Sequence, residues 1–91
     1  MDGISNAMQF AFKEGSVMVT VIVLIQTKPG TAADVCAAAE KIEQVQKAYM
    51  VTGPYDVIAI AELPSRAGFR RLVDEFHEFT GVTRTETCMS I

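Results

Sequence analysis

The sequence predicts an α+β domain in which four antiparallel strands form one sheet and two helices cover one of its faces. Two runs rich in β-branched and aliphatic residues, 17–26 and 55–63, are typical of strands. Two stretches with helical spacing of apolar residues, 31–46 and 65–80, follow these runs along the chain. A chain of 91 residues has room for only one domain of this kind.

The first strand, residues 17–26, is expected to end before the Lys-Pro-Gly sequence at residues 28–30. It places valines and Ile25 on one face and Met18, Ile22 and Leu24 on the other. An antiparallel sheet with one face in water alternates apolar and polar residues, and this strand does not. We therefore expect the helices to cover one face of the sheet and a second copy of the chain to cover the other.

The first helix is expected over residues 31–46, where Thr31 and Asp34 have the spacing of a capping box. Its apolar stripe consists of Val35, Ala38, Ile42 and Val45. A strand over residues 48–52 should follow, joined by a Gly-Pro turn to the strand over residues 55–63. The centre of that last strand is again apolar on both faces, so it too should be covered on both sides.

The second helix is expected over residues 65–80, with Ser65 as its N-cap and Gly81 directly after its end. Its expected buried residues are Phe69, Leu72, Val73, Phe76 and Phe79. A final strand over residues 82–91 completes the order strand, helix, strand, strand, helix, strand. With right-handed crossovers, this order gives a ferredoxin-like βαββαβ fold with both helices on one face of the sheet.

The domain is expected to span residues 17–91. Residues 1–16 are expected to form an N-terminal extension, which either belongs to the natural protein or was added to it. Its central strands are apolar on both faces. Two copies should therefore stack sheet to sheet and form a dimeric α+β barrel.

Composition excludes several classes of function. Apolar residues make up 49% of the chain, charged residues 21%, and the net charge is −3, so nothing indicates direct binding of nucleic acid. An apolar run of membrane-spanning length is missing from the sequence, so we expect no membrane association. Cys36 and Cys88 have no metal-ligand spacing, and we expect buried free thiols in a cytoplasmic protein. We expect neither a metal nor a cofactor.

The sequence identifies no catalytic residue. His77 is the only histidine, and it should lie on the solvent side of the second helix. No second acid, base or metal ligand is placed by sequence to act with it, which favours a binding module over an enzyme. The alternative is a small dimeric-barrel enzyme, such as a cofactor-free monooxygenase, with His77 or Tyr55 facing a pocket inside each protomer. A third possibility is an assembly subunit that binds no ligand.

Polar groups near the Gly-Pro turn and on the last strand have the chemistry to bind a small zwitterion. Such a ligand needs a carboxylate or carbonyls for its ammonium, and O–H or N–H donors for its carboxylate. The hairpin offers Asp56 and the backbone at Gly53 and Tyr55. The last strand offers the hydroxyls of Thr85 and Thr87, which the period of two puts on one face.

Three segments together resemble the effector-binding domain of the Lrp/AsnC regulators, also called the regulation-of-amino-acid-metabolism domain. They are MVTVIVLIQTKPG at residues 18–30, VTGPYDVIA at 51–59 and GVTRTET at 81–87. The resemblance extends over residues 18–91. It implies a ferredoxin-like domain that dimerises sheet to sheet and assembles as rings of dimers. It also implies that small effectors, usually amino acids, bind between neighbouring dimers.

In that family the ligand contacts come from the Gly-x-Tyr-Asp hairpin and the threonines of the last strand. The matching positions here are Gly53, Tyr55, Asp56, Thr85 and Thr87. Full-length members carry a helix-turn-helix domain before this module, whereas only a short segment precedes the first strand here. We therefore expect a stand-alone form that does not bind DNA directly and acts through a partner such as a full-length Lrp/AsnC regulator.

Overall fold

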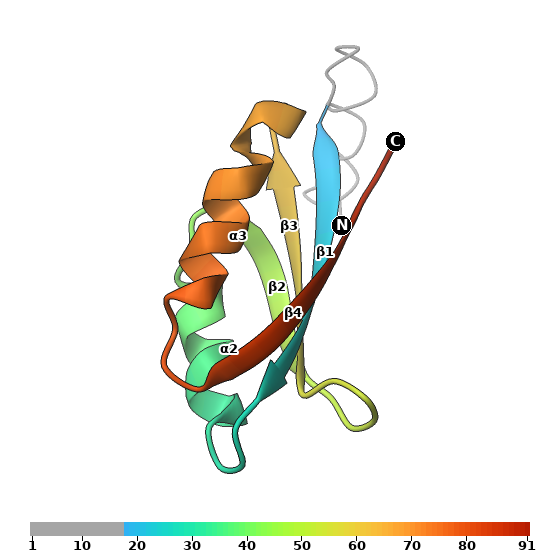
Figure 1. Cartoon of the computed structure of the whole chain (residues 1–91). Helices are drawn as coiled ribbons and strands as arrows, with labels where there is room; N and C mark the ends of the chain where they lie inside the picture. Colours follow the sequence, from blue (N-terminus) through green and yellow to red (C-terminus); the bar gives the residue numbers. More distant parts are fainter. Residues whose placement is uncertain (1–17) are drawn as a thin grey trace, which may run out of the picture.

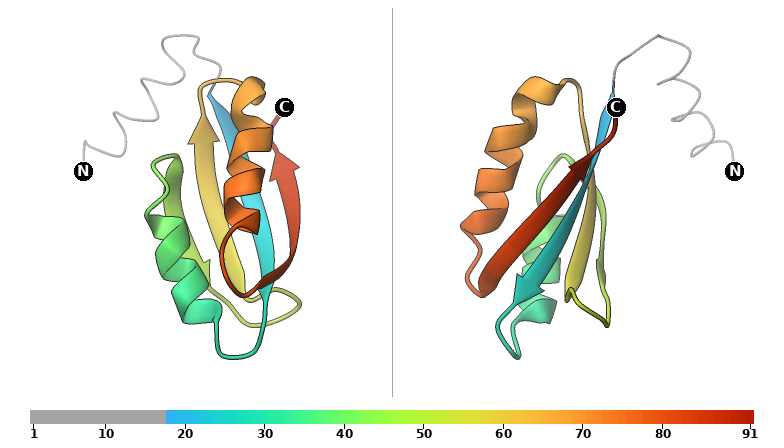
Figure 2. Two further views of the ribbon diagram at one scale, coloured as in Figure 1. Left: turned by 60° about the vertical axis from the view of Figure 1, so that its left-hand side comes forward. Right: turned by 45° about the vertical axis from the view of Figure 1, so that its right-hand side comes forward.

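The computed structural model describes residues 18–91; the predicted N-terminal extension, residues 1–16, lies outside them. In chain order the elements are β1 (Val19–Thr27), α2 (Ala32–Glu40), β2 (Val45–Met50), β3 (Val57–Leu63), the 3-10 turn η1 (Arg66–Gly68), α3 (Phe69–His77) and β4 (Val82–Met89). The strands form one antiparallel sheet in the order β2-β3-β1-β4. Both helices lie on the same face of this sheet (Figure 1 and Figure 2). The predicted ferredoxin-like fold is confirmed.

The core lies between the sheet and the two helices. Alternate residues of the central strands are buried there: Val19, Val21, Val23, Ile25, Val57, Ala59, Ala61 and Leu63. Val35 and Ala39 of α2 and Leu72 and Phe76 of α3 pack against them. The Phe76 ring contacts Phe79 edge to face, with centroids 5.6 Å apart. Full burial of a Val, Leu, Ile or Phe side chain contributes roughly 1.5–3 kcal/mol, so these residues dominate the stability of the fold.

The face of the sheet opposite the helices is also apolar. In the register of the central strands, Ile22 lies opposite Ile60 and Leu24 lies opposite Ile58. Tyr49 of β2 also lies opposite Ile58, on the same face. Ile22 is 37% exposed and Tyr49 is 47% exposed. Within residues 18–91 nothing covers this helix-free face, as the two-faced strand pattern indicated.

The predicted boundary between the first helix and the second strand was wrong. The helix α2 ends at Glu40, not near residue 46, and Val45 is the first residue of β2. Val45 has the spacing of the helical stripe, but in the structure it is buried in the sheet opposite Ala61. Sheet pairing and burial outweighed the local helical pattern at this position.

The two predicted helix starts also differ in detail. Thr31 is the N-cap of α2, but its hydroxyl donates to the carbonyl of Lys28 at 2.8 Å, and no side-chain cap bond forms. The capping box is therefore not made. The Ser65 hydroxyl accepts from the backbone N–H of Ala67 at 3.3 Å, so it caps the turn η1, and α3 begins only at Phe69.

Gly81 joins α3 to β4 in a conformation that favours glycine, and we expect it to tolerate substitution worse than Gly53. Both have positive φ, 100° and 125°, so Ala costs roughly 1–3 kcal/mol of backbone strain at each. At Gly81 a Cβ would also lie 2.6 Å from the Thr31 Oγ1, whereas at Gly53 it would meet nothing within 4 Å. Urea unfolding should show Gly81→Ala to be the more destabilising by about 1–3 kcal/mol. Equal losses would contradict this.

Candidate functional site

The hairpin between β2 and β3 lies at the end of the sheet where β1 finishes (Figure 1). The backbone N–H of Val51 donates to the carbonyl of Asp56 at 2.9 Å and closes the hairpin loop. The side-chain amide of Gln26, near the end of β1, donates to the carbonyl of Pro54 at 2.9 Å. These two bonds hold the loop against the end of β1, so the predicted hairpin residues have a defined position.

Asp56 connects the hairpin to β1 through both its backbone and its side chain. Its N–H donates to the carbonyl of Ile25 at 2.9 Å. Its carboxylate Oδ2 accepts from the backbone N–H of Thr27 at 2.8 Å. An ionised carboxylate has about four lone-pair sites, so this bond leaves capacity to accept from a ligand ammonium. Asp56 therefore fixes the turn and still has the chemistry that the sequence predicted for it.

Tyr55 reaches across the end of β1 to the last strand. Its hydroxyl donates to Glu86 Oε1, and Glu86 Oε2 accepts from Arg84 at 2.8 Å. The hydrogen bond to Glu86 is the largest cause of a raised pKa at Tyr55, followed by desolvation and the negative charge of Glu86, while Arg84 opposes the rise. Glu86 lies opposite Leu24 in the sheet, which places this group on the helix-free face.

The two predicted threonines of β4 lie on the helix side of the sheet. Thr85 is opposite Ile25 and Thr87 is opposite Val23, both of which face the core. The Thr85 hydroxyl lies 2.7 Å from His77 Nε2, at the end of α3. Thr85 and Thr87 are half-buried, so their hydroxyls are at the edge of the core and still within reach of solvent.

The predicted ligand residues therefore occupy two places in the protomer. Gly53, Tyr55 and Asp56 lie at the hairpin end, whereas Thr85 and Thr87 lie on the opposite face of β4 from the Tyr55–Glu86 contact. Their role as ligand residues remains a prediction. Three interacting side chains, Glu86, Arg84 and His77, were not among the predicted ligand residues, and His77 was considered only for the enzyme alternative. Strand alternation places Glu86 on the opposite face from the threonines, but its contact with Tyr55 required the tertiary structure.

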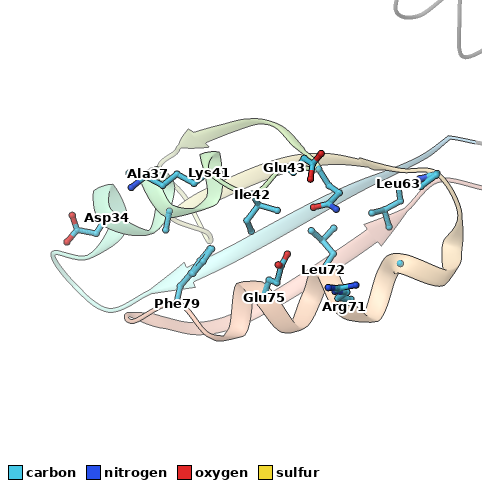
Figure 3. Close-up of a pocket in the computed structure, with 14 residues that line it drawn as sticks. Asp34, Ala37, Lys41, Ile42, Glu43, Leu63, Arg71, Leu72, Glu75 and Phe79 are labelled. Atoms are coloured by element: carbon cyan, nitrogen blue, oxygen red, sulfur yellow. The ribbon is translucent and has the colours of Figure 1, made fainter.

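A groove of about 1000 Å³ runs between α2 and α3 on the outer side of the helical layer. Figure 3 shows Ile42 and Leu72 on either side of it and charged side chains, among them Lys41 and Arg71, around them. Its lining residues are Asp34, Ala37, Ala38, Lys41, Ile42, Glu43, Gln44, Leu63, Pro64, Gly68, Arg71, Leu72, Glu75 and Phe79. Neither His77 nor Tyr55 lines this groove, so it does not match the internal pocket expected of the enzyme alternative.

The cysteines do not form a reactive centre. Burial, and then the negative charge of Glu40, raises the pKa of Cys36, which keeps the thiol protonated and weakly nucleophilic. Cys88 is exposed, so its predicted burial was wrong. It lies opposite Ile22 on the helix-free face of the edge strand β4, where the described chain provides no cover.

Residues 18–91 contain no group of three or more His, Cys, Asp or Glu side chains placed to hold a metal ion. None of the helices in this part of the chain is long and apolar enough to cross a membrane.

The fold is shared with several solved structures. The protein TTHA0845 from Thermus thermophilus is 31% identical over 80% of this chain and 92% of its own, with a TM-score of 0.77. AsnC from E. coli is 18% identical over 97% of this chain and 67% of its own, with a TM-score of 0.76. The regulator NMB0573 from Neisseria meningitidis, solved as an L-Met complex, is 13% identical over 97% and 66%, with a TM-score of 0.73. The last two similarities show the fold alone.

Fold and sequence together define a regulatory ligand-binding domain. The family model of the Lrp/AsnC ligand binding domain matches residues 20–91, which covers almost the whole described structure. The chain therefore belongs to the Lrp/AsnC ligand binding domain family. No curated protein matches the chain. The resemblance inferred from the three sequence segments is confirmed.

Removal of the Asp56 carboxylate should destabilise the fold, because the backbone N–H of Thr27 loses its acceptor. We expect Asp56→Ala to lower the free energy of unfolding by roughly 1.5–3 kcal/mol, the contribution of a hydrogen bond to a charged group. Asp56→Asn should recover part of the loss through its amide oxygen. Asp74→Ala, on the exposed side of α3, is the control and should change stability by less than about 0.5 kcal/mol. Urea unfolding with no difference between Asp56→Ala and the control would contradict this expectation.

The Tyr55–Glu86 hydrogen bond should be visible in the titration of Tyr55. In a Tyr49→Phe background Tyr55 is the only tyrosine, and ultraviolet absorbance then reports its ionisation alone. Glu86→Gln should lower the pKa of Tyr55 towards its usual value, because the carboxylate that favours the neutral phenol is gone.

The same bond fixes the sign of a pH effect on stability. Because folding raises the pKa of Tyr55, its contribution to stability is complete below the unfolded pKa and is lost as pH rises through the folded one. The stability difference between the background protein and Glu86→Gln should therefore shrink at alkaline pH. An unchanged pKa in Glu86→Gln would rule out the contact in solution.

Proposed function

We propose that the chain is a sensing module for a small effector, with an amino acid as the effector. In this proposal it assembles as dimers and rings of dimers and modulates transcription through protein partners, such as a full-length Lrp/AsnC regulator. The observation that carries the proposal is the family match over residues 20–91. The L-Met complex of the Neisseria meningitidis regulator, which shares the fold, supports an amino acid as the class of ligand.

The helix-free face of the sheet supports the dimer. Ile22, Leu24, Ile58 and Ile60 form a continuous apolar surface there, and Tyr49 extends it onto β2. Contiguous apolar patches on soluble domains mark interaction surfaces. Two such sheets packed face to face, about 10 Å apart, would remove both surfaces from water. The same apolar face on a second copy of the chain would match this surface in polarity, which supports a homodimer.

The positions of the predicted ligand residues support a site between protomers. Within one protomer Asp56 lies at the hairpin, whereas Thr85 lies on the helix side of the edge strand β4, where it contacts His77 at the end of α3. Residues at the periphery of the fold can be completed into a site by a neighbouring copy. An effector bound between copies contacts the assembly only, so it must shift the population towards the larger assembly.

No observation favours the enzyme alternative. The groove between α2 and α3 is lined by neither His77 nor Tyr55, and the raised pKa of Cys36 disfavours nucleophilic catalysis at that thiol. His77 is engaged with the Thr85 hydroxyl instead. Family membership supports recognition as the role of these side chains.

The test combines sedimentation with a thermal-shift screen of the twenty amino acids. We expect wild type to sediment as a dimer or a larger species. At least one amino acid should raise its melting temperature and enlarge the assembly. Ile22→Asp should give monomers or insoluble chain, because a carboxylate buried between facing sheets is costly. Ala33→Asp, exposed on α2, adds the same charge on the helical side and should leave the assembly unchanged.

Each part of the proposal can fail separately. A stable, folded wild-type monomer at micromolar concentration would contradict the facing-sheet dimer. If the dimer forms but all twenty amino acids leave melting temperature and mass unchanged, the amino-acid effector is wrong, and a ligand-free assembly subunit becomes the better interpretation. Binding to a monomer without any change in mass would place the site inside one protomer.

A further inference from the structure

The groove between α2 and α3 has an apolar floor along its length. Figure 3 shows Phe79, Ile42, Leu72 and Leu63 following one another along this floor. Ile42 and Phe79 are only half-buried, so within residues 18–91 part of the floor remains in contact with water. The charged side chains around it are Asp34, Lys41, Glu43, Arg71 and Glu75. A groove with an apolar floor and charged edges is the kind of surface in which an amphipathic helix binds.

The sequence that precedes β1 has the pattern of such a helix. Its apolar stripe has the spacing i, i+3, i+4, i+7 and i+8, and it consists of Ile4, Ala7, Met8, Ala11 and Phe12. Among the apolar residues of this stretch only Phe10 falls outside the stripe. A helix this short is marginal in water by itself, so it needs a surface that covers its apolar face.

The stripe and the groove have matching lengths. The stripe extends over nine residues, as many as α2 and as many as α3, which form the two walls of the groove. At 1.5 Å per residue, each of these stretches is roughly 13 Å long as a helix. A helix over residues 4–12 would therefore contact both walls along their full length. The helix-free face of the sheet has no such walls, so the same helix would bury less surface there.

The chain enters β1 beside one end of this groove. Val19, the first residue of β1, pairs with Leu63 at the end of β3, and Leu63 lines the groove. Residues 13–17 connect the stripe to the described part of the chain. Five extended residues span up to roughly 17 Å. This connection is long enough for Phe12 to reach the Leu63 end of the groove.

We propose that residues 4–12 of this chain dock as an amphipathic helix in the groove of their own protomer. Phe12 lies at the Leu63 end and Ile4 lies towards Phe79, because the chain enters the groove from the start of β1. The docked segment adds a third helix to the helical layer and closes the groove to other partners. Neither the effector nor the facing-sheet dimer is needed for this docking.

The test measures the position of the segment with a nitroxide spin label in the whole chain. The label is attached at Ser5→Cys, a polar position outside the stripe, and Cys36→Ala and Cys88→Ser remove the other thiols. In ¹⁵N-labelled protein, the label should broaden the amide signals on the Phe79 side of the groove most strongly. The amide signals of Ile22 and Leu24, on the helix-free face, should keep most of their intensity.

Phe12→Asp and Phe10→Asp form a matched pair, because they make the same change on and off the stripe. Phe12→Asp brings a carboxylate to the apolar floor, which is costly, so most of the broadening in the groove should be lost. Phe10→Asp points away from the floor and should keep it. Both positions precede the described domain, so unchanged amide signals on the central strands should show that each variant is folded.

Three results would overturn the inference. They are an absence of broadening in the groove, stronger broadening at Ile22 and Leu24 than in the groove, and equal effects of Phe12→Asp and Phe10→Asp. A mixed sample checks that the segment docks on its own protomer. When ¹⁵N-labelled chains without the spin label are mixed with spin-labelled chains without ¹⁵N, the groove signals should stay sharp. Broadening in this sample would contradict the same-protomer assignment.

Discussion

The structure depends on two central strands that are apolar on both faces. Pairing of β1 with β3 puts Val23 and Ile25 towards the helices and Ile22 and Leu24 away from them. Hydrogen bonding within the sheet satisfies the backbone but leaves both faces to be removed from water. The helices α2 and α3 cover one face (Figure 2), and the other keeps a half-exposed apolar surface. The need for a second layer over this face follows from this constraint.

Three side-chain contacts gather at the end of the sheet near the β2–β3 hairpin. Asp56 binds the backbone of β1, Tyr55 binds Glu86 on β4, and His77 binds Thr85. These contacts come from segments that are distant in sequence and are brought together by the sheet order β2-β3-β1-β4. The Asp56 contact attaches the hairpin to the central strand β1, and the other two join the hairpin and α3 to the edge strand β4. Together they hold these side chains in defined positions.

The polar groups of the described residues offer hydrogen-bond donors and acceptors to a ligand. A raised pKa keeps the Cys36 thiol protonated, and the histidine side chain is hydrogen-bonded to a hydroxyl at the protein surface. Carboxylate, hydroxyl and guanidinium groups near the hairpin end are the kinds of group that bind a zwitterion. Membership of the Lrp/AsnC ligand binding domain family is in agreement with this chemistry.

The sequence by itself determined the order of the elements, the helix side of the sheet and the two-faced central strands, because these follow from local periodicity. It also led to the family, through segments that include Asp56 and Thr85. It did not determine where α2 ends: Val45 fits a helical stripe, but pairing with Ala61 places it in β2. Nor did it reveal that Tyr55 contacts Glu86 or that His77 contacts Thr85. Those contacts depend on strand register and on the geometry of the crossovers. Both are set by pairing between residues far apart in the chain, which forms only when the sheet assembles.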